Sequence, residues 1–238
     1  MTYDLSLTAV AAAIGDSARA AILIALMDKR SRTAKELAFL ARISASTASA
    51  HLGKLLDLGL VSVTAQGRNR FFKLASPLVG QMLETMSNVA AEMQPRHPRA
   101  AGTESLRLAR TCYDHLAGRI GVMIADALQE QGHVRLSDDG GEVTDSGRAF
   151  FLRLGLDIDR VRHSRRIFCK PCLDWTERRP HLAGSLGAAL CRHCLDQGWV
   201  ERMRDSRALT ITPEGRKNLI ECFGIELEPT PADSRSAA

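Results

Sequence analysis

The sequence predicts a mainly α-helical protein of the α+β class, with small β-hairpins and more than one domain. Apolar residues recur at helical spacing over residues 7–58 and again over residues 78–93. Stretches such as residues 60–74 alternate between apolar and polar residues around a glycine, which indicates a β-hairpin. Residues 94–105, QPRHPRAAGTES, hold two prolines, one glycine and no aliphatic residue larger than alanine, a composition typical of a linker.

This linker divides the 238 residues into an N-terminal domain, 1–93, and a C-terminal unit, 106–227, followed by a tail, 228–238, predicted to be disordered. The net charge of +5 is compatible with a polyanionic partner. The longest strongly apolar run, Ala20 to Met27, is far shorter than the roughly 20 residues of a membrane span. Since no secretory signal is evident either, we expect a cytoplasmic protein with no membrane partner and with reduced cysteines.

Capping residues mark the helices expected in the N-terminal domain. A first helix carries apolar residues over positions 7–14, and Asp16 is placed to cap a second. Thr33 and Glu36 have the spacing of a capping box at the start of a third helix. Ser44 is placed to cap a fourth helix, which a glycine ends.

A β-hairpin and a long helix follow the fourth helix. The hairpin is expected to turn at Gln66–Gly67. The helix carries an apolar seam at intervals of four, four, three and four residues, which gives it coiled-coil character. The seam residues are Leu78, Met82, Met86, Val89 and Met93.

Two helices joined by a tight turn at Arg42–Ile43, then a hairpin, are the elements of a winged helix-turn-helix domain, which binds double-stranded DNA. The second helix enters a major groove only if its leading face is slim and forms hydrogen bonds. We expect base-edge contacts from the hydroxyl residues of this face and phosphate or minor-groove contacts from the basic residues around it. These residues are Ser44, Ser46, Thr47 and Ser49, then His51 and Lys54, and then Arg68 and Arg70 near the hairpin tip. The alternative is a winged helix used for protein contacts.

The N-terminal domain resembles the ArsR/SmtB family of bacterial winged-helix repressors over about residues 8–92. The resemblance lies in GDSAR at 15–19, ISASTASAHL at 43–52, GLV at 59–61 and GRNRFFKL at 67–74. Ser17 stands where the family pattern has proline. The resemblance implies a homodimer on a pseudo-palindromic operator, with the first helix and the Leu78–Met93 helix in the dimer contact. It also implies repression that a signal relieves.

The metal sites of that family have no counterpart in the N-terminal domain. The helix that starts at Thr33 reads TAKELAFLAR and lacks a Cys-x-Cys pair, and QMLETMSNVAAEM after the hairpin lacks a histidine. We therefore expect any signal to enter through the C-terminal unit.

The C-terminal unit contains an internal repeat. HLAGRIG begins at His115 and HLAGSLG at His181, 66 residues later. VTDSGRAF at Val143 and ITPEGRKN at Ile211 follow in the same order, 68 residues apart. The sequence therefore predicts two repeated helix–hairpin–helix modules.

The cysteines of this unit suggest a metal site. Cys169, Cys172, Cys191 and Cys194 form the pattern C-x₂-C-x₁₈-C-x₂-C, which suits a four-thiolate site for Zn²⁺ or another thiophilic metal ion. A reversible dithiol switch and cysteines that only pack in the core are the alternatives. Packing is plausible because the first repeat has Ala125 and Leu128 at the positions of the second pair.

A pocket for an organic anion at the start of the two repeats is a second candidate. Its lining would be Cys112, Tyr113, His115, Trp175, Arg178 and His181. In the alternative interpretation the aromatic residues anchor one repeat on the other and the two histidines cap helices. Cys112 and His115 are also considered as half of a metal site.

No catalytic motif is present in the sequence: a glycine-rich phosphate loop, a nucleophile elbow and a His-Glu-x-x-His helix are all missing. We predict a non-enzymatic, sequence-specific transcription regulator, a repressor released by a soft metal ion, an oxidant or a small molecule sensed in the C-terminal unit. The alternative is a DNA-binding or protein-interaction module without a ligand response.

Overall fold

The computed structural model describes residues 2–93, 104–137, 140–162 and 166–228. Most of the predicted linker and tail lies outside the described residues. The chain forms two compact units. The first comprises Met1–Ala100 with the segments Thr111–Asp114 and Met203–Arg207, and the second comprises Ala101–Arg110, His115–Arg202 and Ala208–Ala238.

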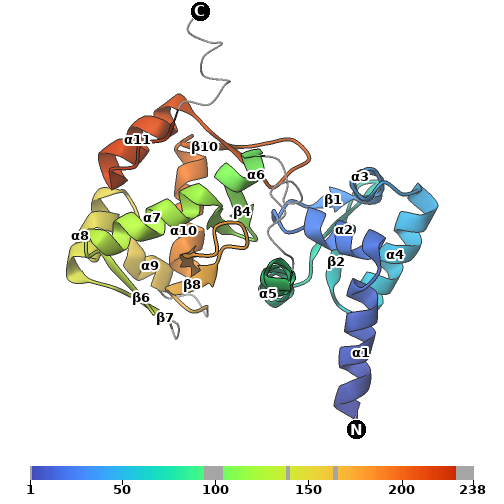
Figure 1. Ribbon diagram of the computed structural model, residues 1–238. Helices are drawn as coiled ribbons and strands as arrows, with labels where there is room; N and C mark the ends of the chain where they lie inside the picture. Colours follow the sequence, from blue (N-terminus) through green and yellow to red (C-terminus); the bar gives the residue numbers. More distant parts are fainter. Residues whose placement is uncertain (1, 94–103, 138–139, 163–165, 229–238) are drawn as a thin grey trace, which may run out of the picture. The chain divides into compact units, whose positions relative to one another are not determined.

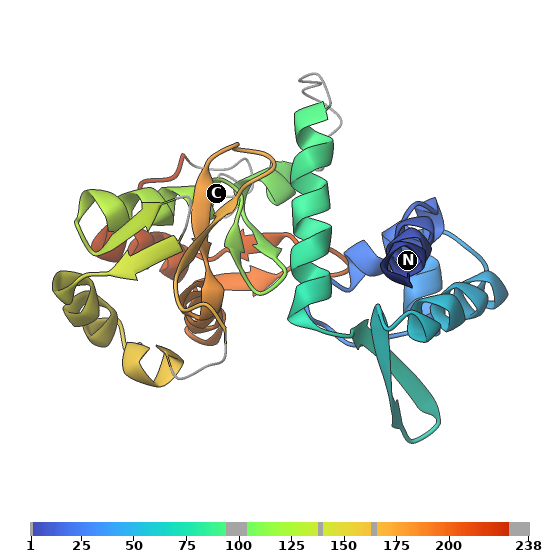
Figure 2. The ribbon, with the colours of Figure 1, turned by 90° about the horizontal axis from the view of Figure 1, so that it is seen from below.

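The first unit contains five helices and a small antiparallel sheet among its described residues (Figure 1). The helices are α1 (Thr2–Ile14), α2 (Ser17–Ala25), α3 (Ala34–Ala41), α4 (Ala45–Asp57) and α5 (Pro77–Met93). The strands β1 (Arg32–Thr33), β2 (Val61–Gln66) and β3 (Asn69–Leu74) pair in the order β1-β3-β2. The β2–β3 hairpin projects away from the helices of this unit (Figure 2).

The predicted caps of three helices are confirmed. The carboxylate of Asp16 accepts a hydrogen bond from the backbone N–H of Arg19 at 2.9 Å, and Thr33 forms the capping box with Glu36. Ser44 Oγ accepts from the N–H of Thr47 at 3.1 Å. Each bond satisfies an N–H that would otherwise lack a partner at the helix start, so these short polar side chains set where the helices begin.

Apolar residues from all these elements form the core of the first unit. The buried face of α4 consists of Ala48, Leu52 and Leu55, which lie three or four residues apart. They pack in one cluster with residues of the other helices and of the sheet, including Ile22, Leu23, Leu26, Leu37, Phe72 and Leu74. Packing therefore fixes which face of α4 points outward.

The remaining described elements form four separate two-stranded sheets and six helices. In order they are α6 (Glu104–Leu108), β4 (Arg110–Cys112), β5 (His115–Ala117), α7 (Arg119–Glu130), β6 (Val134–Ser137), β7 (Gly140–Val143), α8 (Asp145–Arg153), α9 (Ile158–Arg162), β8 (Lys170–Leu173), β9 (Pro180–Ala183), α10 (Gly184–Asp196), β10 (Val200–Arg202), β11 (Leu209–Ile211) and α11 (Pro213–Phe223). One hydrophobic core, with Leu128, Phe151 and Leu186 fully buried, joins the helices of the second unit.

The two HLAG segments are strands, so the expectation that they begin helices is wrong. Each is the second strand of a hairpin, β4–β5 or β8–β9, that precedes the predicted module. Gly118 and Gly184 end these strands with φ of +78° and +82°, a conformation that disfavours residues with a Cβ. A Cβ on either glycine would also lie 2.6 Å from a backbone oxygen. The chain therefore turns at the glycine, and the helix starts only there.

Among the described residues, no single helix has both the length and the hydropathy needed to span a membrane. The bent pair Ser6–Ile14 and Ser17–Ala25, with 86° between its helices, reaches that length and composition only when the two are taken together.

Candidate functional site

Helix α4 exposes a group of hydroxyls at its N-terminal end, outside the face formed by its buried residues. Ser44, Ser46, Thr47 and Ser49 are all exposed at its N-terminal end, and Lys54 is exposed one turn beyond. Ser44 Oγ lies 2.9 Å from Ser46 Oγ and 2.7 Å from Thr47 Oγ1. Ser49 Oγ donates a hydrogen bond to the carbonyl of Ala45 at 2.9 Å. Because these hydroxyls are exposed, replacing their local bonds with bonds to another partner leaves no buried polar group unpaired.

His51 lies differently from the other predicted DNA-contacting residues. Its ring is partly buried, with Nδ1 3.3 Å from a guanidinium nitrogen of Arg19 and Nε2 3.9 Å from the Asp16 carboxylate. Arg19 also donates to the carbonyls of Ala12 and Ala13 at 2.9 and 2.7 Å. This guanidinium therefore links α1, α2 and α4, a role that was not predicted although Arg19 belongs to the GDSAR motif.

The β2–β3 hairpin carries its two arginines at an exposed tip. Gln66 pairs with Asn69, so the turn consists of Gly67 and Arg68, one residue later than predicted. Gly67 has φ of +59°, which glycine adopts without strain. Arg68 and Arg70 are exposed, and the guanidinium of Arg70 lies 5.5 Å from the ring centre of Phe72.

Residues 16–63 match the family model described as "Bacterial regulatory protein, arsR family". Over 208 residues the chain is 41% identical to the uncharacterized HTH-type transcriptional regulator YdfF of Bacillus subtilis strain 168, a match that covers 87% of this chain and 92% of YdfF. The chain belongs to the ArsR family. Its first unit is the winged helix-turn-helix domain of an ArsR-family regulator.

Solved structures of this kind cover a smaller part of the chain. The homodimeric winged helix-turn-helix DNA-binding domain of Mb0332 from Mycobacterium bovis, a possible ArsR-family regulator, is 25% identical and covers 38% of this chain and 83% of its own, with a TM-score of 0.36. The cadmium metal-sensor CMTR from Mycobacterium tuberculosis is 27% identical and covers 40% of this chain and 99% of its own, with a TM-score of 0.32.

Among the described residues, the four cysteines of the predicted metal site do not lie together in one ligand cluster. Within the described ranges, Cys172 lies together with Cys112, His115 and His181, and Cys169, Cys191 and Cys194 lie outside this group. All six cysteines are described and none forms a disulfide. Cys169 lies before β8, whereas Cys172 lies within that strand.

The three excluded cysteines are core residues. Cys191 and Cys194 lie on the buried face of α10, and Cys169 lies in the same hydrophobic core just before β8. Burial raises the pKa of the Cys169 thiol to about 12 and raises that of Cys194 as well. Both groups are therefore neutral thiols at neutral pH, which suits packing.

The predicted organic-anion pocket is only partly assembled. Cys112, His115 and His181 come together, but Tyr113 lies in the core of the first unit and Arg178 is exposed. The Trp175 ring lies under the guanidinium of Arg110, 4.6 Å from ring centre to carbon. The suggestion that the two histidines cap helices is wrong, since both lie on strands.

The histidines of this cluster face each other in a buried environment. His115 Nε2 and His181 Nε2 lie 3.1 Å apart. Burial lowers the pKa of His181, although the neighbouring Cys172 and Asp174 act in the opposite direction. His181 is therefore neutral at neutral pH, the form of imidazole that binds metal ions. Cys172 had been assigned to a different set, so spacing alone did not identify its partners.

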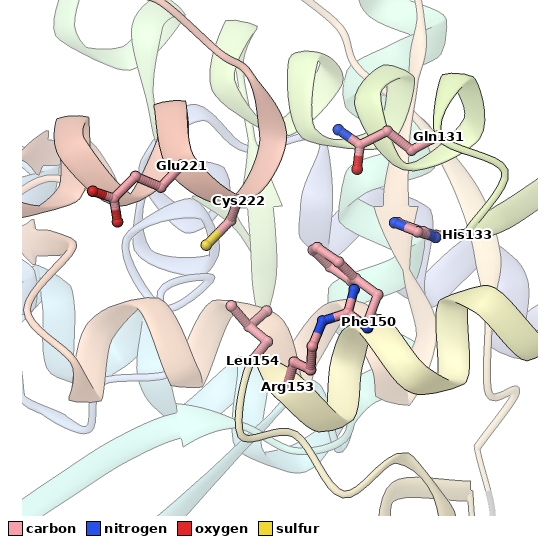
Figure 3. A pocket seen from close by; sticks show the side chains of 7 residues that line it. All are labelled: Gln131, His133, Phe150, Arg153, Leu154, Glu221 and Cys222. Carbon is pink, nitrogen blue, oxygen red and sulfur yellow. The ribbon is translucent and has the colours of Figure 1, made fainter.

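A pocket of about 280 Å³ at the ends of α7, α8 and α11 contains none of the predicted site residues. Figure 3 shows its lining, which consists of Gln131, His133, Phe150, Arg153, Leu154, Glu221 and Cys222. The His133 ring stacks on Phe150 with ring centres 4.5 Å apart. Burial, with the charge of Arg153, lowers the pKa of His133.

Proposed function

We propose that the protein is a sequence-specific DNA-binding transcription regulator that acts by binding, without catalysis, in the bacterial cytoplasm. Helix α4 enters the major groove, and Arg68 and Arg70 of the β2–β3 hairpin contact the adjacent backbone or minor groove. The observation that carries this proposal is the group of exposed hydroxyls at the N-terminal end of α4, outside the buried face that anchors the helix. Membership of the ArsR family supports it independently.

A homodimer is part of this proposal. The α5 seam is largely exposed within one chain: Leu78, Met86, Val89 and Met93 have relative exposures of 73%, 45%, 49% and 80%. An apolar stripe of this regular spacing is typical of a helix that packs on a second helix. A second copy of the same chain supplies such a helix and two-fold symmetry for a palindromic operator.

We further propose that the second unit consists of two copies of one module and receives the regulatory signal. The orders β4-β5-α7-β6-β7-α8 and β8-β9-α10-β10-β11-α11 correspond element by element. Thr144 and Thr212 cap the last helix of each copy. A Cβ on Gly147 or Gly215 would lie 2.0 or 1.9 Å from a backbone oxygen at the start of the preceding hairpin. In the first unit, the two helices in which the family resemblance would place metal ligands lack the Cys-x-Cys pair and the histidine. We therefore assign the binding of the regulatory signal to the second unit.

The test of DNA binding is a comparison of two duplexes over a range of salt concentrations, the chain's own upstream DNA and a random duplex of equal composition. We expect Ser49→Ala to cost about 1–3 kcal/mol on the upstream DNA and little on random DNA, since a base-edge contact is lost. Arg68→Ala is expected to weaken binding to both duplexes and to reduce the salt slope by about one.

Ser87→Ala provides the matched control for Ser49→Ala. Ser87 is a residue of α5, away from the seam, whose hydroxyl donates to the carbonyl of Leu83 at 2.8 Å, the same local bond that Ser49 makes in α4. It should leave both affinities unchanged. Equal losses on the two duplexes for Ser49→Ala would remove α4 from its role as the recognition helix.

A further inference from the structure

Two β-hairpins each present a cysteine and a histidine together. In β8–β9, Cys172 lies directly opposite His181 in the antiparallel register. In β4–β5, Cys112 ends the first strand and His115 begins the second, separated by a two-residue turn. Residues directly opposite in antiparallel strands lie on one face with Cβ atoms about 4.5–5.5 Å apart. Each hairpin therefore offers one sulfur and one imidazole nitrogen as a pair.

The two pairs converge on one point. The four ligand atoms all lie within 4.8 Å of one another, and the two Nε2 atoms are 3.1 Å apart. Bond lengths of about 2.0–2.1 Å for Zn–N and about 2.3 Å for Zn–S place tetrahedral nitrogens about 3.3 Å apart and sulfurs about 3.8 Å apart. The histidine nitrogens are thus already close to the separation that a shared metal ion requires.

We propose that Cys112, His115, Cys172 and His181 form a tetrahedral Cys₂His₂ site for Zn²⁺ or another thiophilic divalent cation. All four residues lie on the β4–β5 and β8–β9 hairpins, and the two-residue turn fixes Cys112 beside His115. The donor set matches the ligands that Zn²⁺ takes in closed sites. It is distinct from the positions at which the ArsR/SmtB resemblance would have placed a metal.

Charge and burial favour a divalent ion here. Cys112, His115 and His181 are buried, and Cys172 is partly buried. An uncompensated charge in such a place is costly. Two thiolates and two neutral imidazoles around a divalent cation carry no net charge, whereas a monovalent ion would leave one negative charge in the buried site. The site therefore selects divalent soft ions over hard ions such as Mg²⁺, which prefer oxygen ligands.

Asp174 lies where metal-bound histidines usually have an outer hydrogen-bonding partner. Its Oδ2 atom lies 3.5 Å from His181 Nδ1, and both side chains are fully buried. When His181 Nε2 binds a metal, Nδ1 carries the proton and points toward this carboxylate. Arg110, at 2.8 Å from the other oxygen, holds Asp174 in place.

The site also accounts for the repeated HLAG sequence. In each copy, the histidine supplies a ligand, and the two glycines of HLAGxxG let the following helix pack closely on its strand. A Cβ on Gly121 would lie 2.6 Å from the carbonyl oxygen of Leu116, and one on Gly187 would lie 2.3 Å from that of Leu182. Gly121 also faces the Cβ of His181, and Gly187 faces that of His115, so each copy supports the histidine of the other.

This inference deepens the proposed regulation by naming its ligand class, and it rests on the proposed function only for its regulatory meaning. Metal binding is measured without DNA, so a failure of the metal-site proposal is distinguishable from a failure of the proposed DNA-binding function. Loss of DNA binding in a protein that still holds the metal would contradict the proposed function alone.

The experiment is a Co²⁺ titration of the full-length protein after removal of metal under reducing conditions. We expect one Co²⁺ per chain, with the intense visible bands of a tetrahedral ion and a near-ultraviolet band from thiolate ligands. X-ray absorption of the Zn²⁺-loaded wild-type protein should show two sulfur neighbours at about 2.3 Å and two nitrogens at about 2.0–2.1 Å. A shell of four sulfurs, or the absence of stoichiometric binding, would overturn the proposal.

Substitutions separate this site from the other cysteines. Cys172→Ser is expected to weaken Co²⁺ binding by more than the roughly 10- to 100-fold typical of an outer-shell change and to reduce the thiolate band. Cys222→Ser, a partly buried cysteine outside the cluster, is the matched control and should keep the wild-type spectrum. A change in Cys222→Ser equal to that in Cys172→Ser would contradict the assignment. The X-ray measurement uses wild-type protein and decides the matter even if a variant misfolds.

Discussion

Asp174 organises the buried polar groups near the cysteine–histidine cluster. Its carboxylate accepts hydrogen bonds from Arg110 at 2.8 Å, from the N–H of Gly118 at 2.7 Å and from both the N–H and the hydroxyl of Thr176 at 2.9 and 2.7 Å. Burial alone would raise the pKa of Asp174, but the charges of Arg110 and His181 and the hydrogen bonds hold it below its usual range. The group is therefore a buried carboxylate paired with a buried guanidinium.

Asp174→Asn is expected to lower the free energy of unfolding of the metal-free protein by about 3–5 kcal/mol, because it leaves the buried charge of Arg110 without its partner. Denaturant unfolding measures this loss. Asp126→Asn is the matched control, since Asp126 pairs with Arg179 at 2.8 Å but that arginine is 59% exposed. The control should lose only about 0–1 kcal/mol. Similar losses in both variants would contradict the importance of the buried pair.

Residue-scale prediction from the sequence worked where the interaction is local and failed where it is not. Asp16, Thr33 and Ser44 were identified as caps because their partners lie three residues along the chain. The pairing of Asp174 with Arg110 spans 64 residues and has no local signature. For the same reason Cys172 was assigned to the neighbouring C-x-x-C motif, whereas its partners come from other strands.

At the scale of elements, the order of helices and the hairpin in the first unit followed from periodicity and caps. The β4–β5 and β8–β9 hairpins were missed because their strands are only three or four residues long, too short to show alternation. The HLAG segments were expected at the start of the first helix of each module. The positive φ of the following glycine separates the strand from the helix, and this φ depends on how the chain packs.

Helix α5 provides the element-scale prediction. Met86→Glu places a charge in the exposed seam, and we expect it to convert a dimer of the full-length chain to a monomer, because a buried unpaired carboxylate opposes association. Sedimentation velocity measures the change. Leu152→Glu on α8 is the control, since Leu152 is 69% exposed but lies outside the seam, and it should leave the mass unchanged. A dimer that survives Met86→Glu and Val89→Glu together would place the contact elsewhere.

At the scale of the whole molecule, we propose that the first unit reads DNA and that the two cysteine–histidine hairpins hold a metal ion. The sequence alone indicated this division of labour, because the first 111 residues contain no cysteine and the six cysteines all follow. The ligand set required the three-dimensional structure. A metal ion changes the affinity of the protein for DNA only if the ion binds the DNA-bound protein and the DNA-free protein with different affinities.

The most direct test of this account is the affinity of the full-length protein for its upstream DNA, measured at fixed salt with Zn²⁺ and with a chelator. For a repressor released by metal, we expect Zn²⁺ to weaken DNA binding by roughly 5- to 150-fold, a coupling of about 1–3 kcal/mol. The double variant Cys112→Ser, Cys172→Ser should bind this DNA as the metal-free wild type does and show no response to Zn²⁺. Equal DNA affinity of the wild-type protein in its metal-loaded and metal-free forms would contradict the central claim.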